Sequence, residues 1–147
     1  MQPILATPIP KNQLSIKSLG LKHYKYYGLP EKCIILLVHN RGTKAVSFPV
    51  DNLKNNFVSE PFYTYEIKAS TSKDWVPAAI EIGTYQAPAI FRAIQSRKSV
   101  KLCVYYPDWP TGSPALESGS SIRLQIKDSV GQSHITQTFS STGQSQH

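Results

Sequence analysis

Two stretches in the last third of the chain alternate between apolar and polar residues. They cover residues 99–107 and 121–128, and a loop rich in Gly, Ser and Pro separates them. A period of two places successive side chains on opposite faces of an extended strand. The pattern therefore predicts two half-buried antiparallel strands, which indicates a fold class without naming any chemistry.

Similar patterns along the rest of the chain predict further strands. Residues 32–40 are apolar on both faces and so predict a central strand. A turn with Gly42 follows, and we expect residues 44–48 to return as the hairpin partner of that strand. The other expected strands cover residues 13–19, 62–68, 75–82 and 133–139, with 22–30 as a loop or short edge strand and 89–95 as a strand or helical turn.

Seven to nine short strands and no convincing helix predict an all-β protein. One open sheet of that size would leave an apolar face in water, whereas two sheets packed face to face bury it. We therefore expect a two-sheet antiparallel β-sandwich over residues 13–139, with a closed β-barrel as the alternative. Residues 1–12 are expected to form a flexible or edge arm. Residues 140–147 contain no hydrophobic residue and are expected to be a disordered tail.

The order of these features resembles the immunoglobulin-like and fibronectin type III-like sandwiches. A strand ending at residues 38–42 (VHNRG) stands in the usual place of strand B, and residues 96–106 and 119–128 look like the last strands. The antibody pattern is absent, because no Trp follows Cys33 at the usual spacing and no Tyr stands two positions before Cys103. The resemblance implies an architecture and carries over no functional residues.

The two cysteines are expected to be free thiols. Cys103 shares the outward face of its strand with Lys101 and Tyr105, and Cys33 lies opposite the apolar set of its own strand. On the outer faces of opposite sheets the two could not approach to the Cα separation that a disulfide needs. Cys103 is not at a helix N-terminus, so nothing in the sequence predicts a lowered pKa for its thiol.

Motifs that carry catalytic or metal chemistry are missing from the sequence. No two of the four histidines lie within five residues of each other, and Cys-x-x-Cys, His-x-His and Gly-x-Ser-x-Gly do not occur. Gly-rich phosphate loops are absent as well. We therefore expect no catalytic residue, no metal, no cofactor and no enzyme activity. The chain has no run of 18 apolar residues, so we expect no membrane span.

Aromatic residues are the best candidates for a binding surface, because Tyr and Trp are enriched at interfaces. One group lies at the end of the predicted strand over residues 99–107 and in the loop after it, and a second lies in the basic N-terminal third. For Tyr106 and Trp109 the alternative is that their rings cover the end of the core. The candidate residues are Tyr105, Tyr106, Asp108 and Trp109 in the first group and Lys22, Tyr24, Lys25 and Tyr26 in the second.

Charge and these rings lead to three hypotheses for function. The first is a non-catalytic module that binds a protein partner through loops or an edge strand. The second is a carbohydrate-binding module that stacks sugars on exposed Tyr and Trp rings. The third and weaker one is binding of nucleic acid or another acidic polymer, since the net charge is +7 and residues 1–44 contain seven basic residues and one acid.

Geometry separates the first two hypotheses. A flat row of exposed rings favours sugar binding, whereas an exposed edge strand, or an apolar patch without aligned rings, favours protein binding. We expect the protein to be cytoplasmic if the chain is complete, and extracellular or periplasmic if a signal peptide has been removed.

Overall fold

The computed structural model describes residues 13–146 except 52, 61 and 79–89. For Tyr26 it describes the backbone but not the side chain. The described residues confirm the all-β class, and no helix among them is long and apolar enough to cross a membrane. The elements are β1 (Leu14–Tyr26), β2 (Leu29–Asn40), β3 (Val46–Val50), β4 (Tyr63–Lys68), β5 (Val76–Pro77), β6 (Ile90–Ile94), β7 (Ser99–Tyr106), the short 3-10 helix η1 (Pro114–Leu116), β8 (Ser121–Lys127) and β9 (Ser133–Ile135).

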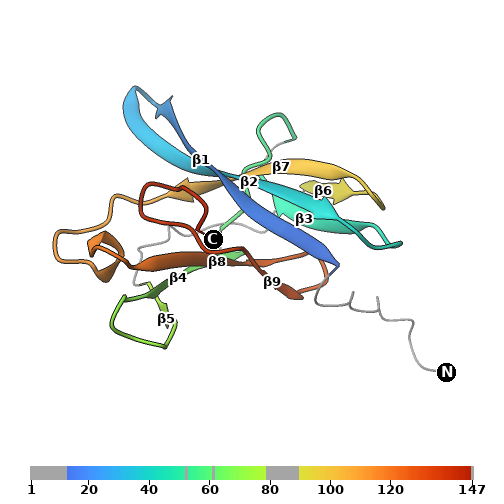
Figure 1. Ribbon diagram of the computed structural model, residues 1–147. Coiled ribbons are helices and arrows are strands. Elements are labelled where there is room, and N and C mark those ends of the chain that lie inside the picture. Colours follow the sequence, from blue (N-terminus) through green and yellow to red (C-terminus); the bar gives the residue numbers. More distant parts are fainter. Residues whose placement is uncertain (1–12, 52, 61, 79–89, 147) are drawn as a thin grey trace.

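The strands form three antiparallel sheets, ordered β1-β2-β7, β3-β6 and β5-β4-β8-β9. Each sheet is open, and none closes into a barrel among the described strands. In Figure 1 the first two sheets lie together above the four-stranded sheet. This layering is consistent with a β-sandwich.

The core lies between the layers and is filled by side chains from alternate positions of the strands. β2 contributes Ile34, Leu36 and Val38, all fully buried, as expected for a central strand. Burying a side chain of this size stabilises the fold by roughly 1.5–3 kcal/mol. Leu102 and Val104 of β7, beside them in the same sheet, are also fully buried, as are Ile122, Leu124 and Ile126 of β8 in the opposite layer.

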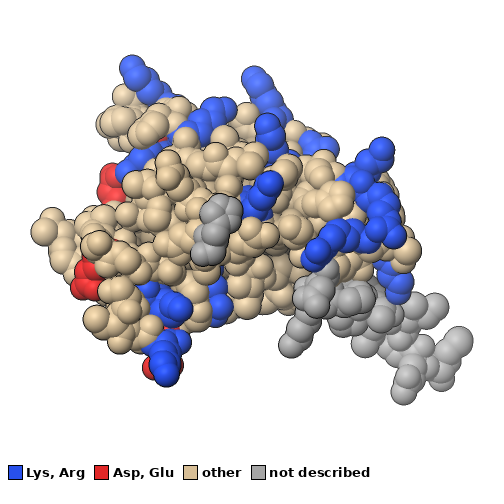
Figure 2. Space-filling view, viewed as in Figure 1, with Lys and Arg blue, Asp and Glu red and all other residues tan. Residues whose placement is uncertain are grey.

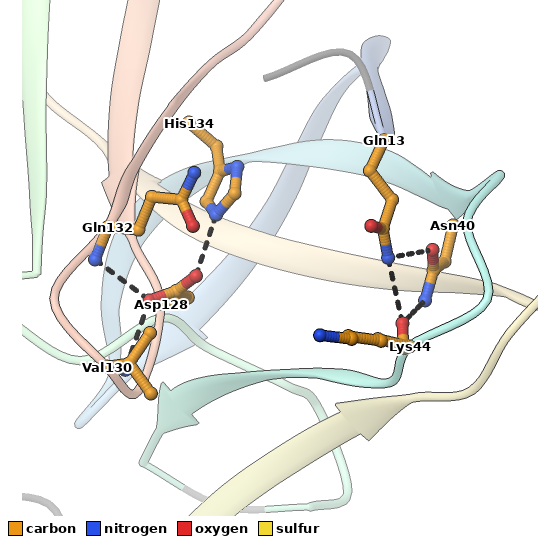
Figure 3. Close-up of polar contacts among 7 residues, drawn as sticks. All are labelled: Gln13, Asn40, Lys44, Asp128, Val130, Gln132 and His134. Atoms are coloured by element: carbon orange, nitrogen blue, oxygen red, sulfur yellow. Dashed lines mark hydrogen bonds and ion pairs between the residues drawn. The ribbon is translucent and has the colours of Figure 1, made fainter. Parts of the chain in front are cut away.

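The expected hairpin between residues 32–40 and 44–48 is wrong, because β3 pairs with β6 instead of β2. Asn40 at the end of β2 is buried, and its backbone bonds to Arg97 and Lys98 in the β6–β7 turn. The Asn40 side-chain amide donates to the carbonyls of Lys44 and Ile94, at 2.8 and 3.0 Å. Figure 3 shows Gln13 donating to both Asn40 and Lys44. These bonds direct the chain away from β2 into the second sheet.

The first strand has 13 residues, nearly twice the length of the predicted 13–19. β1 passes through a bulge between Ser18 and Gly20, where a φ of +113° at Gly20 suits a residue without a side chain. It then continues to Tyr26 beside β2. Of the two alternatives for residues 22–30, a loop or a short edge strand, the edge strand is therefore correct for residues 22–26. In Figure 1 this β1–β2 hairpin projects beyond the body of the molecule.

The strands over residues 99–106 and 121–127, which the sequence likened to the last strands of an immunoglobulin-like domain, lie in different sheets. β7 pairs with β2 and β8 pairs with β4, so they lie in different sheets. In immunoglobulin domains the last two strands, F and G, share one sheet. β8 also pairs with the strand that follows it, β9, so the last two strands of the chain share one sheet.

Residues 140–146 fold back onto the sheets, which differs from the disorder expected for the tail. Ser145 Oγ donates to the Ser18 carbonyl at 2.9 Å, and Ser18 Oγ donates to the Gly143 carbonyl. Tyr106 Oη donates to the Ser141 carbonyl at 2.6 Å. Hydrogen bonds and not apolar burial hold this segment, so its hydropathy gave no sign of order. Residues 1–12 and 147 lie outside the described residues.

Candidate binding pocket on the outer face of the first sheet

A pocket of about 580 Å³ opens on the outer face of the β1-β2-β7 sheet, near the projecting end of the β1–β2 hairpin. Its walls contain four aromatic rings, three carboxylates and one lysine. The rings belong to Tyr24, Phe57, Tyr63 and Tyr105.

Three strands and a loop position these rings, with Tyr63 at the start of β4. Tyr24 of β1 is opposite Glu31 of β2, and Tyr105 of β7 points outward because its neighbour Tyr106 points inward. Phe57 reaches the site because its segment bonds to the free edge of β7. Val58 N donates to the Cys103 carbonyl at 2.8 Å, and Cys103 N donates to the Asn56 carbonyl at 3.0 Å. The Tyr24 and Phe57 ring centroids are 5.5 Å apart and their planes are tilted by 59°.

The pocket is electronegative. Glu31, Asp51 and Glu60 line it together with a single lysine, Lys25. Tyr63 Oη donates to Glu60 Oε1 at 3.0 Å, and Ser59 Oγ donates to Asp51 Oδ1 at 2.9 Å, which holds these carboxylates in place.

The tyrosines of the pocket respond to burial and to this charge. Burial, followed by the nearby Cys33 and Glu31, raises the pKa of Tyr24 to about 12. Burial and Glu31 raise the pKa of Tyr105, and burial and Glu60 raise the pKa of Tyr63. All three rings therefore stay neutral at physiological pH and contribute faces and hydroxyls, not charge.

Three of the predicted residues meet in this pocket: Tyr24, Lys25 and Tyr105. They come from the two candidate groups, which are some eighty residues apart in sequence. Lys22 is exposed and lies opposite Cys33, one row along the sheet from Tyr24. The side chain of Tyr26 lies outside the described residues.

The remaining members of the first group are placed elsewhere. Asp108 is exposed and forms an ion pair with Lys32, with 3.1 Å between Nζ and Oδ1. Tyr106 is buried, and its ring makes edge contacts with those of Tyr65 and Trp109. Trp109 Nε1 donates to Tyr106 Oη at 2.8 Å. Tyr106 thus belongs to the core and not to a contact surface, as its place in the inward set with Leu102 and Val104 could have indicated.

Trp109 has a second role besides packing on Tyr106. It is half-buried and lines a separate cavity of about 340 Å³ together with Val76 and Pro110. The ring of Trp109 is 88° from that of Tyr65, so it stands on edge against the core. This ring therefore offers no broad exposed face.

Sequence inspection missed Phe57 and the three carboxylates. Phe57, Asp51 and Glu60 lie in or beside a loop that only long-range pairing brings to β7, and no local sequence pattern predicts such pairing. Glu31 had a weak signal, because it follows the aromatic and basic run that includes Tyr24.

The two cysteines lie on the same outer face, and their placement is a correction. Cys33 is opposite Tyr105 and Cys103 is opposite Ile35, so the cysteines are diagonal neighbours on adjacent strands. The prediction had put them on opposite sheets, because pairing of β7 with β2 was not foreseen. Both are free thiols, as predicted.

A second buried polar group supports the β8–β9 turn (Figure 3). His134 Nε2 is 2.8 Å from Asp128 Oδ2, and both side chains are almost completely buried. Asp128 Oδ1 accepts from the backbone of Val130 and Gln132. The pair therefore holds a turn. Within the described ranges, no group of three His, Cys, Asp or Glu side chains could hold a metal ion.

One group of positively charged side chains lies away from the pocket. The β2–β3 and β6–β7 turns are joined through Asn40 and contain Arg41, Lys44, Arg97 and Lys98, all exposed. Figure 2 shows Lys and Arg side chains concentrated at the end of the molecule where these turns lie.

No protein-family model matches the chain, and no curated protein is significantly similar to it. Function is therefore inferred from the pocket itself.

Proposed function

We propose that the protein is a non-catalytic binding module that engages a protein partner at this pocket and along the adjoining edge strand β1. The observation that carries the proposal is the meeting of Tyr24, Phe57 and Tyr105 with Glu31 and Glu60 in one concave site. Concave sites with rings and a few convergent polar groups are the common form of binding sites.

Ring geometry favours a protein over a carbohydrate. The Tyr24 and Phe57 rings are tilted by 59°, and the Tyr106 and Trp109 rings are perpendicular and packed on the core. No flat row of exposed rings results from these orientations. β1 is an edge strand, and residues 137 and 143–145 already contact it at Ile16, Ser18 and Leu21. An extended peptide could add to its remaining part, residues 22–26, by backbone hydrogen bonds.

Charge indicates which side chain of the partner enters the pocket. Three carboxylates and one lysine favour a cation, and the neutral tyrosine faces add a cation–π attraction worth roughly 0.5–2 kcal/mol. We therefore assign the pocket to an arginine or lysine side chain of the partner. The same charge disfavours nucleic acid at this site.

The fold is proposed to be immunoglobulin-like in its layering alone. Two layers of antiparallel strands enclose one core, which supports a two-sheet sandwich. The strand order is a variant, because β7 and β8 belong to different layers.

A titration followed by amide chemical shifts tests the proposal. The probes are two capped tripeptides, acetyl-Gly-Arg-Gly-amide and acetyl-Gly-Glu-Gly-amide. We expect the arginine probe to shift the amides of residues 24, 31, 57 and 105 in a saturable way and the glutamate probe to leave them unchanged. Equal shifts with both probes, or shifts confined to other surfaces, would count against the proposal.

Matched variants assign the effect to the pocket. Glu31→Gln removes one charge at constant size and should weaken the arginine probe several-fold. Phe91→Ala truncates a ring that is exposed on β6, outside the pocket lining, and should change nothing. A glycan array screened with wild-type protein and Tyr105→Ala tests the carbohydrate alternative, which would gain if uncharged sugars bound in a Tyr105-dependent manner.

A further inference from the structure

Cys33 and Cys103 form a contact pair of thiols on the outer face of the β1-β2-β7 sheet. The register makes them diagonal neighbours, and a side-chain hydrogen bond joins the two thiols. Cys33 is 1% exposed, whereas Cys103 is partly exposed. One thiol is thus accessible to a small reagent and the other is held beside it.

The surroundings divide the two thiols into different roles. The hydrogen bond from Cys33 lowers the pKa of Cys103 to about 7, with burial opposing this shift and Lys22 adding to it. The same hydrogen bond, followed by burial, raises the pKa of Cys33. The exposure of the two residues agrees with this division, because the thiolate forms at Cys103, the more accessible of the two sulfurs. The sequence had predicted no lowered pKa for Cys103, and contact with Cys33 is the reason for the difference.

We propose that Cys103 is a site of reversible oxidation by small hydroperoxides, and that Cys33 is the resolving thiol that closes a disulfide between β2 and β7. This inference does not depend on the pocket's partner. It assigns a chemical modification to two residues that the proposed binding function leaves unused.

The chemistry takes place in two balanced steps. The Cys103 thiolate attacks the terminal oxygen of the hydroperoxide, so an S–O bond forms and the O–O bond breaks. Sulfur loses two electrons, and the leaving alkoxide takes up a proton to become an alcohol. The Cys33 sulfur then attacks the Cys103 sulfur, the S–S bond forms, and the hydroxyl leaves with the Cys33 proton as water.

The strand geometry makes this disulfide easy to reduce. Diagonal residues on an antiparallel pair have Cα atoms roughly 7–8 Å apart. Unstrained disulfides have Cα separations of about 4.4–6.8 Å, so closure draws β2 and β7 together. Strained disulfides have higher reduction potentials and are the labile ones. A thiol reductant should therefore reopen the bond rapidly.

Intact-mass measurement after hydrogen peroxide treatment tests the proposal. We expect the reduced wild-type protein to lose two hydrogens and remain monomeric, and dithiothreitol to restore them. Cys33→Ser should gain one oxygen on Cys103 that reacts with dimedone. Cys103→Ser should be unchanged under the same conditions, and circular dichroism should show both variants folded.

Alkylation against pH gives an independent readout. Iodoacetamide should label Cys103 with a midpoint near pH 7 in the wild type, and the midpoint should rise in Cys33→Ala because alanine has no side-chain donor to replace the Cys33 thiol. Oxidation that produces only intermolecular dimers, or equal reactivity of Cys33 and Cys103, would overturn the proposal. Lys22→Gln should shift the midpoint upward by a smaller amount than Cys33→Ala.

Discussion

Tyr105 and Tyr106 are neighbours on β7, yet they belong to two different aromatic groups. Tyr105 faces outward and lines the electronegative pocket with Tyr24 and Phe57. Tyr106 faces inward and packs against Tyr65 and Trp109. In the inner group, Tyr65, Tyr106 and Trp109, the polar atoms form hydrogen bonds within the protein. In the outer group, Tyr24, Phe57 and Tyr105, the ring faces line the pocket.

The difference teaches how a buried tyrosine is satisfied. Tyr106 Oη accepts from Trp109 and donates to the Ser141 carbonyl, so both functions of the hydroxyl are used within the core. Tyr65 Oη donates to the backbone carbonyl of Tyr105 at 2.6 Å, which links the two groups through the main chain and not through the pocket rings. Stability should therefore depend on the inner group and binding on the outer group.

Truncation of the inner group should have the largest effect. Tyr65 is 1% exposed and contacts three rings, so Tyr65→Ala leaves a large cavity. We expect the free energy of unfolding to fall by about 3–5 kcal/mol in urea titrations. Tyr24→Ala, the corresponding truncation in the outer group, should cost far less. An equal loss of unfolding free energy in the two variants would show that the two groups do not differ in their contribution to stability.

The tail that closes over Tyr106 gives the next effect. Gly143 has a φ of +84°, and an added Cβ would lie 2.9 Å from Leu21 Cγ. Gly131 has a similar φ of +86° but open space around it. The left-handed backbone alone costs roughly 1–2 kcal/mol in each alanine variant. Gly143→Ala should therefore unfold at a lower urea concentration than Gly131→Ala, and identical midpoints would show that the tail does not pack on β1 in solution.

Removal of single hydroxyls sharpens the comparison further. Tyr106→Phe leaves Trp109 Nε1 and the Ser141 carbonyl without their partner, and should cost about 1–3 kcal/mol in thermal or urea unfolding. Tyr105→Phe keeps the ring on the outer face and should change stability by less than about 0.5 kcal/mol. A loss of stability in Tyr105→Phe as large as in Tyr106→Phe would contradict the division.

Much of the fold could be predicted from alternation alone, because apolar period-two runs mark strands wherever one face is buried. The central strand, the all-β class and the outward facing of Cys103 follow from it. Pairing of β3 with β6, and of β7 with β2, could not be predicted, because it depends on contacts such as those of Asn40 that link distant segments. The order of residues 140–146 was likewise hidden, since backbone hydrogen bonds leave no trace in hydropathy.

The pocket was predictable in part for the same reason. Tyr24 and Tyr105 were candidates because rings in a basic or loop-flanked context suggest contact. Phe57, Asp51 and Glu60 were not, because only the hydrogen bonds of residues 56 and 58 to Cys103 bring their loop to the sheet. Alternation along β7 carried the information that separates Tyr105 from Tyr106.

The central claim is that Tyr105 serves binding and Tyr106 serves stability. It is tested most directly by measuring both properties in Tyr105→Ala and Tyr106→Phe, using the acetyl-Gly-Arg-Gly-amide titration and urea unfolding on the same samples. We predict that Tyr105→Ala loses most of the affinity for the probe and keeps its unfolding midpoint, whereas Tyr106→Phe keeps the affinity and unfolds earlier. Affinity and stability falling together in both variants would contradict the account.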